Sequence, residues 1–155
     1  MDYGLDDLRS SVDHSTVSAA TVSHWSVGMQ VHHCCLAMIG ICQALIDSKP
    51  PPPPTCWSMM TSIVFLSGRI PRGRGKAPEV ALPKQDISKE ELRSLLDRSG
   101  QLSKEAGELD RDRWFKHFAF GILDRDKSLK LLRIHNRHHL RIIADIVAAK
   151  RESAA

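Results

Sequence analysis

A long stretch without charged residues, residues 27–46, constrains the fold more than any other feature of the chain. Its length is close to that of a membrane-spanning helix. Polar side chains interrupt it at Gln30, His32, His33 and Gln43. An apolar helix with such interruptions is typical of the centre of a helical bundle, so the stretch predicts a buried helix and no membrane span.

This predicted helix has signals at both ends. Ser26 precedes it and can accept a hydrogen bond from a backbone amide of the first turn. The helix should run to about Asp47 and end by Lys49, because the five prolines at 50–54 cannot continue it. The prolines then belong to a loop over residues 49–55.

The rest of the chain also favours helix over strand. Only 5% of the residues are aromatic, and strand-like alternation is scarce. Ser88 and Glu91 form a capping box that opens a helix, in which Gly100 and Gly107 predict a kink or an early end. The other predicted segments are a short helix at 5–14, a second core helix at 56–66, an irregular Gly/Pro/Arg loop within 68–87, a compact aromatic turn at 114–121, and a last helix from Asp124 or Asp126 to about Arg151.

These elements predict an all-α four-helix bundle that forms a single domain over residues 1–155. The length suits one domain with its own core. A content of 26% charged and 42% apolar residues is ordinary for a soluble globular protein. We therefore expect a soluble protein.

Charge and cysteine usage narrow the choice of partners and compartment. The net charge of +4 is spread along the chain. Nucleic-acid binding is supported only by four basic residues of one short segment, so it is not expected: Arg69, Arg72, Arg74 and Lys76. Three of the cysteines, Cys34, Cys35 and Cys42, fall in the apolar helix, where free cysteine acts as a small core residue, and Cys56 completes no CxxC pair. Because no signal peptide is evident either, we expect a reducing cytoplasm.

The strongest chemical signal is a pair of histidines on the last predicted helix. His135 and His139 continue a 3-4 spacing with Leu132, Ile142 and Ile146, so they occupy the side that faces a bundle core. Burying an imidazole there costs free energy unless its nitrogens find partners. Rings four residues apart lie on one face and can chelate a single ion. The alternative is two core histidines that form hydrogen bonds across the bundle, but for a pair at this spacing a metal is favoured.

A third ligand has to come from another helix. His32 and His33 are the histidines on a comparably buried element, whereas His14 and His24 lie in polar surroundings and should be solvated. His138 lies on the flank of the pair, where it could support the site or replace His139, but we expect it to be peripheral. Three histidines with open positions are typical of a catalytic site rather than a closed structural one.

The order of these motifs resembles the DinB-like (YfiT-type) superfamily of metalloproteins. Trp25-Ser26 followed by His33 resembles its W-S…H segment, and the stretch from His135 to His139 resembles its H-x-x-H-H helix. The similarity covers roughly residues 25–147. The resemblance implies a four-helix bundle and the ligand set His33, His135 and His139. It also implies a divalent ion (nickel, zinc, iron or manganese), frequent homodimers, and thiol-dependent transferase or hydrolase activity in some branches.

Three functional hypotheses follow. The first is a metal-dependent transferase or hydrolase, in which the metal activates a thiol or water for attack on a small-molecule substrate. The second is a non-enzymatic binding protein that the ion stabilises, and the third is a nucleic-acid partner. No general base is evident, because Asp124 and Asp145 lie off the histidine face and are expected at the surface. The 68–83 segment is expected at the mouth of the metal pocket or at a subunit contact.

Overall fold

The computed structural model describes residues 3–54, 59–73 and 77–154. Its elements in chain order are α1 (Leu5–Ser11), the short 3₁₀ turn η1 (Val12–His14), α2 (Val27–Asp47), α3 (Met59–Ser67), a second 3₁₀ turn η2 (Glu79–Ala81), α4 (Lys89–Glu108), β1 (Trp114–His117), β2 (Gly121–Asp124) and α5 (Arg125–Glu152). The described part is mostly helical but contains a two-stranded antiparallel sheet.

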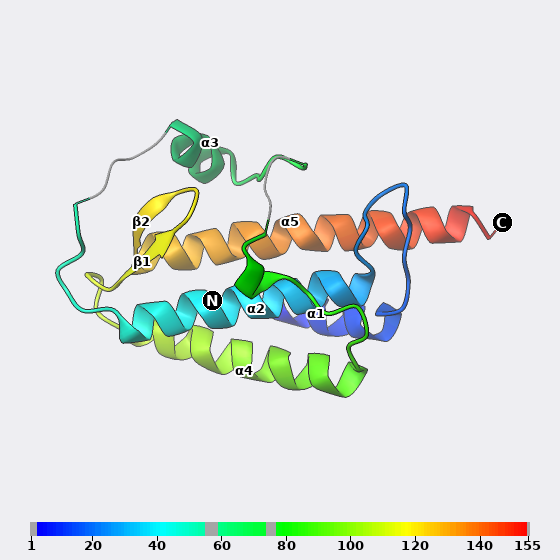
Figure 1. Ribbon diagram of the computed structural model, residues 1–155, viewed down its shortest axis with the longest axis horizontal. Helices are drawn as coiled ribbons and strands as arrows, with labels where there is room; N and C mark the ends of the chain where they lie inside the picture. The colour runs from blue at the N-terminus through cyan, green and yellow to red at the C-terminus, as the bar shows by residue number, and fades with distance from the viewer. Residues whose placement is uncertain (1–2, 55–58, 74–76, 155) are drawn as a thin grey trace.

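The prediction of an all-α four-helix bundle is therefore wrong. Only three of the described helices, α2, α4 and α5, are long, whereas α1 has 7 residues. The segment that follows α1 and η1 is rich in Ser, Thr and β-branched residues, which favour turns and caps over helix interiors, so it does not extend the first helix. α2 and α4 run in one direction and α5 in the other, with α1 packed against all three (Figure 1).

The buried core lies between α2 and its neighbours. One cluster includes Leu8, Val31, Leu96 and Ile146 and joins α1, α2, α4 and α5. A second cluster, which includes Met38, Leu45, Leu129 and Leu132, continues the core toward the other end of α2. Fully burying each such side chain stabilises the fold by about 1.5–3 kcal/mol relative to leaving it exposed.

α2 has the bounds that its local signals predict. The hydroxyl of Ser26 accepts a hydrogen bond from the amide of Met29, and the helix ends at Asp47 before the prolines. By length and composition α2 could cross a membrane. However, its buried side is packed against α4 and α5, as expected for a core helix.

The other long helices also begin at predicted caps. Ser88 accepts a hydrogen bond from the amide of Glu91, and Asp124 accepts one from the amide of Lys127. α4 continues through Gly100 and ends at Glu108, directly after Gly107. Neither glycine interrupts the helix, which ends one residue after Gly107.

The predicted aromatic turn at 114–121 is instead the first part of a β-hairpin. Trp114 pairs with Asp124 and His117 with Gly121, which leaves a three-residue loop between the strands. Gly121 has φ 72°, a left-handed conformation that glycine adopts without strain at the end of such loops. Arg113 donates hydrogen bonds to the carbonyl oxygens of Ile46 and Ser48, so the start of the hairpin is held at the end of α2.

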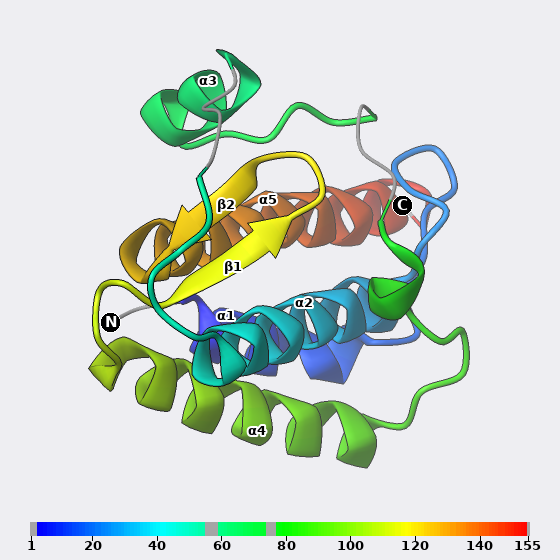
Figure 2. The ribbon, with the colours of Figure 1, turned by 60° about the vertical axis from the view of Figure 1, so that its left-hand side comes forward.

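α3 lies apart from the long helices, beyond the hairpin and α5 (Figures 1 and 2). Val64 and Phe65 pack against the hairpin and α5 through Phe120, Leu123 and others. The opposite side of α3 is exposed, with Met59 80% and Leu66 88% accessible. The prediction of a second core helix therefore holds for one side of α3 only, and its predicted start at residue 56 lies outside the described residues.

Candidate metal centre

Three histidines from two antiparallel helices meet at one point of the structure. α2 contributes His33, and α5 contributes His135 and His139, one helical turn apart. Their potential ligand nitrogens all lie within 4.8 Å of one another. His33 and His139 are buried and His135 is partly buried. The structure thus brings together the three residues that the sequence and the resemblance indicated.

The spacing of the ring nitrogens suits a shared ion. The Nε2 atoms of His33 and His135 are 3.1 Å apart. Two nitrogens that each lie about 2.1 Å from a tetrahedral ion are about 3.4 Å from each other. A divalent cation therefore fits between these two rings with little movement, and His139 completes a group of three.

Two of the rings are oriented by hydrogen bonds on the side away from this point. The Nδ1–H of His33 donates to the carbonyl oxygen of Ala81 at 2.7 Å. The Nδ1–H of His139 donates to Oε1 of Gln30 at 2.6 Å. Because each Nδ1 carries the proton, each Nε2 keeps its lone pair for a ligand, as is usual for metal-binding histidines.

The third ring has a different environment. Since Nε2 of His33 has no proton, Nε2–H of His135 must donate the hydrogen bond between them. This leaves Nδ1 of His135, which is buried and has no hydrogen-bond partner among the described residues. A buried nitrogen without a partner costs free energy. The three histidines His33, His135 and His139, called the trio below, therefore lack one hydrogen bond as a core cluster. Their ring nitrogens are atoms that a divalent transition metal binds.

The electrostatics favour neutral, ligand-competent imidazoles. Burial lowers the pKa of His33 and His139 below their ordinary value, and the neighbouring His135 lowers that of His139 further. Burial, with the adjacent His33, lowers the pKa of His135 to about 3. All three rings are therefore uncharged at neutral pH, which metal coordination requires.

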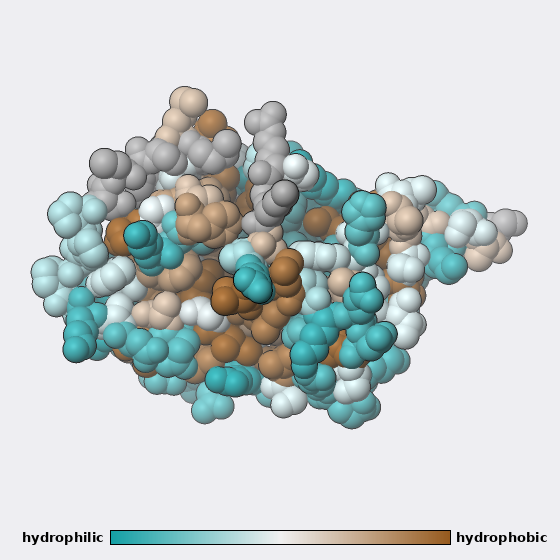
Figure 3. All heavy atoms as spheres, viewed as in Figure 1, coloured by the Kyte–Doolittle hydropathy of each residue, from teal (hydrophilic) through white to brown (hydrophobic). Residues whose placement is uncertain are grey.

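The trio opens into a cavity of about 680 Å³. α2, α5, the hairpin and residues of the segments 70–73 and 77–81 contribute to its wall. Among the described residues, the lining consists of five histidines and otherwise of apolar side chains, glycine and proline. Figure 3 shows a hollow on this face of the molecule, with many apolar residues gathered around it. The volume is in the range of small-molecule sites.

The 68–83 segment was expected at the mouth of the metal pocket or at a subunit contact, and described residues of it lie at the cavity next to the three histidines. The residues of this segment that line the cavity are Ile70, Pro71, Gly73, Ala77, Pro78, Val80 and Ala81, and Ala81 also accepts the hydrogen bond from His33. Arg72 does not line the cavity but pairs with Asp145 on α5 at 2.7 Å. Arg74 and Lys76 lie outside the described residues.

The other histidines have separate roles. Nδ1 of His32 accepts a hydrogen bond from the amide of Lys84, so this ring faces the segment before α4 and not the trio. His138 lines the cavity beside His139, with ring centres 5.1 Å apart. His14 and His24 are exposed, as predicted. The structure therefore places His33, and not His32, beside His135 and His139.

Three further residues lie next to the trio, and nothing in their chemistry indicated from the sequence that they belong to the site. Gln30 and Ala81 orient His139 and His33, and the indole of Trp25 lies 5.0 Å from the ring of His33 and stacks on His139 at 6.4 Å. Gln30 is 1% exposed. A glutamine inside an apolar stretch, one turn before a histidine, was the signal for it; no local pattern marks Ala81.

The remaining candidates for catalysis are not at the site. Asp124 caps α5 and pairs with Lys127, and Asp145 pairs with Arg72, so both have the expected surface roles. Burial raises the pKa of the Cys34, Cys35 and Cys42 thiols. These three cysteines are free and buried, as predicted, and Cys56 lies outside the described residues.

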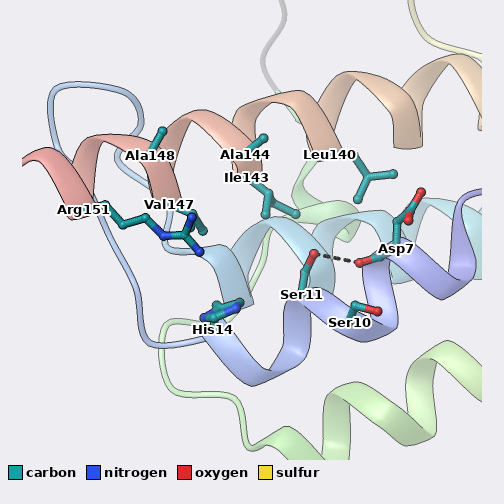
Figure 4. A pocket seen from close by; sticks show the side chains of 10 residues that line it. All are labelled: Asp7, Ser10, Ser11, His14, Leu140, Ile143, Ala144, Val147, Ala148 and Arg151. Atoms are coloured by element: carbon teal, nitrogen blue, oxygen red, sulfur yellow. Dashed lines mark hydrogen bonds between the residues drawn. The ribbon is translucent and has the colours of Figure 1, made fainter.

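A second hollow, of about 520 Å³, lies between α1 and the end of α5. Leu140, Ile143, Ala144 and Val147 form its apolar side (Figure 4). Asp7, His14 and Arg151 stand along its edges. It contains no group of three metal-ligating side chains among the described residues.

Comparison with known proteins identifies a family but no function. No curated protein and no solved structure matches the chain. A family model described as "Protein of unknown function (DUF1569)" matches residues 5–145, which include α1, the three histidines and most of α5. This protein therefore belongs to the DUF1569 family.

Proposed function

We propose that this protein is a divalent-metal-dependent enzyme that uses His33, His135 and His139 as ligands and acts as a thiol-dependent transferase or a hydrolase. The observation that carries the proposal is the convergence of three neutral imidazoles at the wall of a cavity. Their order along the chain also supports a relationship to the DinB-like superfamily, which is part of the proposal. A low-molecular-weight thiol is the co-substrate that this relationship favours.

Two features favour a catalytic over a structural ion. Structural zinc sites usually have four protein ligands and are closed, whereas catalytic sites leave a position open. Here the potential ligands among the described residues are three histidines, and they border a cavity large enough for a small molecule. A purely stabilising ion needs no such cavity.

The chain's own residues would orient the ligands and exclude charge. Hydrogen bonds to Ala81 and Gln30 orient the rings of His33 and His139, and the indole of Trp25 lies beside the same two rings. A divalent ion bound here would act as a Lewis acid and lower the pKa of a thiol or water that reaches it. Among the described residues no Asp or Glu lines the cavity, so His138 is the side chain best placed to accept the released proton.

The test of the ligand set is metal content. His33→Ala, His135→Ala and His139→Ala should each abolish retention of about one equivalent of divalent metal per chain. His14→Ala and His24→Ala are the controls, because both rings are exposed and away from the trio. Elemental analysis of protein purified without a His-tag gives the readout. Equal metal content in all five variants would refute the assignment.

A second measurement tests the nucleophile. Cobalt-loaded protein titrated with 2-mercaptoethanol should develop a sulfur-to-cobalt charge-transfer band if a thiol reaches the metal. The band should be absent in the His135→Ala variant. If no band develops in the wild type, the thiol-dependent reaction is refuted, and hydrolysis remains to be assayed with ester and amide substrates.

A further inference from the structure

The cavity beside the histidines is elongated along two helices. On α2, its lining residues follow His33 at helical spacing: Leu36, Ala37, Gly40 and Ile41. On α5, Leu131 precedes His135 by one turn and lines the same cavity. Because α2 and α5 run in opposite directions, Leu131 and the stripe on α2 lie on the same side of the histidines, toward one end of the bundle (Figure 1). The cavity therefore has a polar end at the trio and an apolar arm.

The arm is bordered by apolar residues of the hairpin. Phe115 and Phe120 line it, and so does Phe118, which is 66% exposed. On the η2 side Val80, 86% exposed, also lines the cavity. Exposed large apolar side chains at the rim of an apolar cavity are typical of a ligand-binding groove.

Gly40 marks the place where the arm opens to solvent. The residue is exposed and lines the cavity, and a Cβ atom added there would meet nothing within 4 Å. Seven residues separate it from His33, which is about 10 Å along a helix at 1.5 Å per residue. A carbon chain of about eight atoms, with bonds of about 1.5 Å in a zigzag, covers a similar length.

We propose that this cavity binds a straight alkyl or acyl chain of about eight carbons, with the polar head of the same molecule at the three histidines. The inference rests on the proposed function, because the metal ion proposed there would bind the polar head. It adds the chemical class of the substrate. Outside the trio, the described lining offers only His117 and His138 as polar side chains and none that is acidic, so a peptide or sugar body would find few partners for its polar groups.

The test is a chain-length series. Cobalt-loaded protein is titrated with straight-chain carboxylates of four to ten carbons by calorimetry, while the visible spectrum of cobalt reports binding of the head. Each added methylene should tighten binding about fourfold, from its transfer free energy. The gain should continue to about eight carbons and then stop.

Gly40→Leu and Gly107→Leu form a matched pair of variants. Both glycines lie in long helices, both have free space for a Cβ, and Gly107 does not line the cavity. Gly40→Leu should weaken octanoate at least tenfold and leave butanoate unchanged. Gly107→Leu should change neither. Binding that does not depend on chain length, or an equal effect of Gly40→Leu on both carboxylates, would overturn the proposal.

An experiment without metal tests this proposal separately from the proposal of the metal site. Straight-chain alcohols are titrated into protein stripped of metal. If the wild type retains no metal but the alcohols still show the chain-length gain and the effect of Gly40→Leu, the metal function fails and the chain site stands. If metal binds and neither series depends on length, the chain site fails and the metal function stands.

Discussion

Removing the hydrogen bond that orients His139 gives a direct test of how the trio is built. Gln30 accepts from Nδ1–H of His139 at 2.6 Å and donates from Nε2 to the hydroxyl of Ser23 at 3.0 Å. In Gln30→Leu the His139 Nδ1–H loses its acceptor, and the ring is free to choose the other tautomer. That tautomer carries its proton on the nitrogen that should bind the metal.

The magnitude can be worked out from two effects. Loss of a group that orients a metal-binding histidine typically costs 10–100-fold in metal affinity. At a free metal concentration of 100 times the wild-type dissociation constant, the ion stabilises the wild type by about 2.7 kcal/mol. With affinity weakened 10–100-fold, that stabilisation falls to about 1.4–0.4 kcal/mol. Without metal, the buried, unpaired Nδ1–H should destabilise the variant by about 1–3 kcal/mol.

Two further variants make the result specific. Gln43→Leu changes a glutamine of the same helix whose side chain bonds only to the exposed Asp47, so it should leave metal affinity unchanged. Gln30→Glu keeps the acceptor and should restore affinity. Competition with a chromophoric chelator measures affinity, and urea unfolding with and without metal measures the stabilisation. Wild-type metal affinity in Gln30→Leu, or an equal loss in Gln43→Leu, would refute the reasoning.

Two other predictions concern protons and thiols. Because burial lowers the pKa of His135 to about 3, this ring stays neutral in the folded protein while it takes up a proton in the unfolded chain below about pH 6.5. The contribution of His135 to the free energy of unfolding is therefore fully present above that pH and is lost as the pH drops. Metal-free protein should lose about 2 kcal/mol of its free energy of unfolding from His135 alone between pH 7 and pH 5, measured by urea unfolding. A constant unfolding free energy over this interval would contradict it. Replacing all four cysteines with Ala should leave metal content unchanged, because the three described thiols are buried with raised pKa and lie off the trio; loss of metal with the histidines intact would make the site a mixed Cys/His one.

The sequence predicted those parts of the fold that short-range signals determine. Ser26, Ser88 and Asp124 cap helices where they were expected, because a cap depends only on the next three residues. The last helix was predicted with its histidines on the inner side, because their spacing repeats within one element. Such features need no knowledge of the rest of the chain.

The parts that were missed depend on contacts between distant segments. The hairpin strands are only four residues long, and aromatic residues followed by Gly121 were interpreted as a turn without a paired strand. The exposed side of α3 could not be foreseen, since an apolar segment gives no sign of which neighbour covers it. Gln30 and Ala81 reach the histidines across separations of 109 and 48 residues, which no local pattern encodes.

The physical cost of the trio is the strongest reason to assign it a function. Leucine at these three positions would continue the core stripes of α2 and α5 and bury apolar surface worth about 1.5–3 kcal/mol per side chain. The chain instead holds three imidazoles whose pKa values burial lowers. It also supplies outer partners for two of them from separate segments and leaves one buried nitrogen without any. Packing alone gains nothing from this arrangement, whereas a bound cation would use the imidazole nitrogens as ligands and offset the cost through its binding free energy.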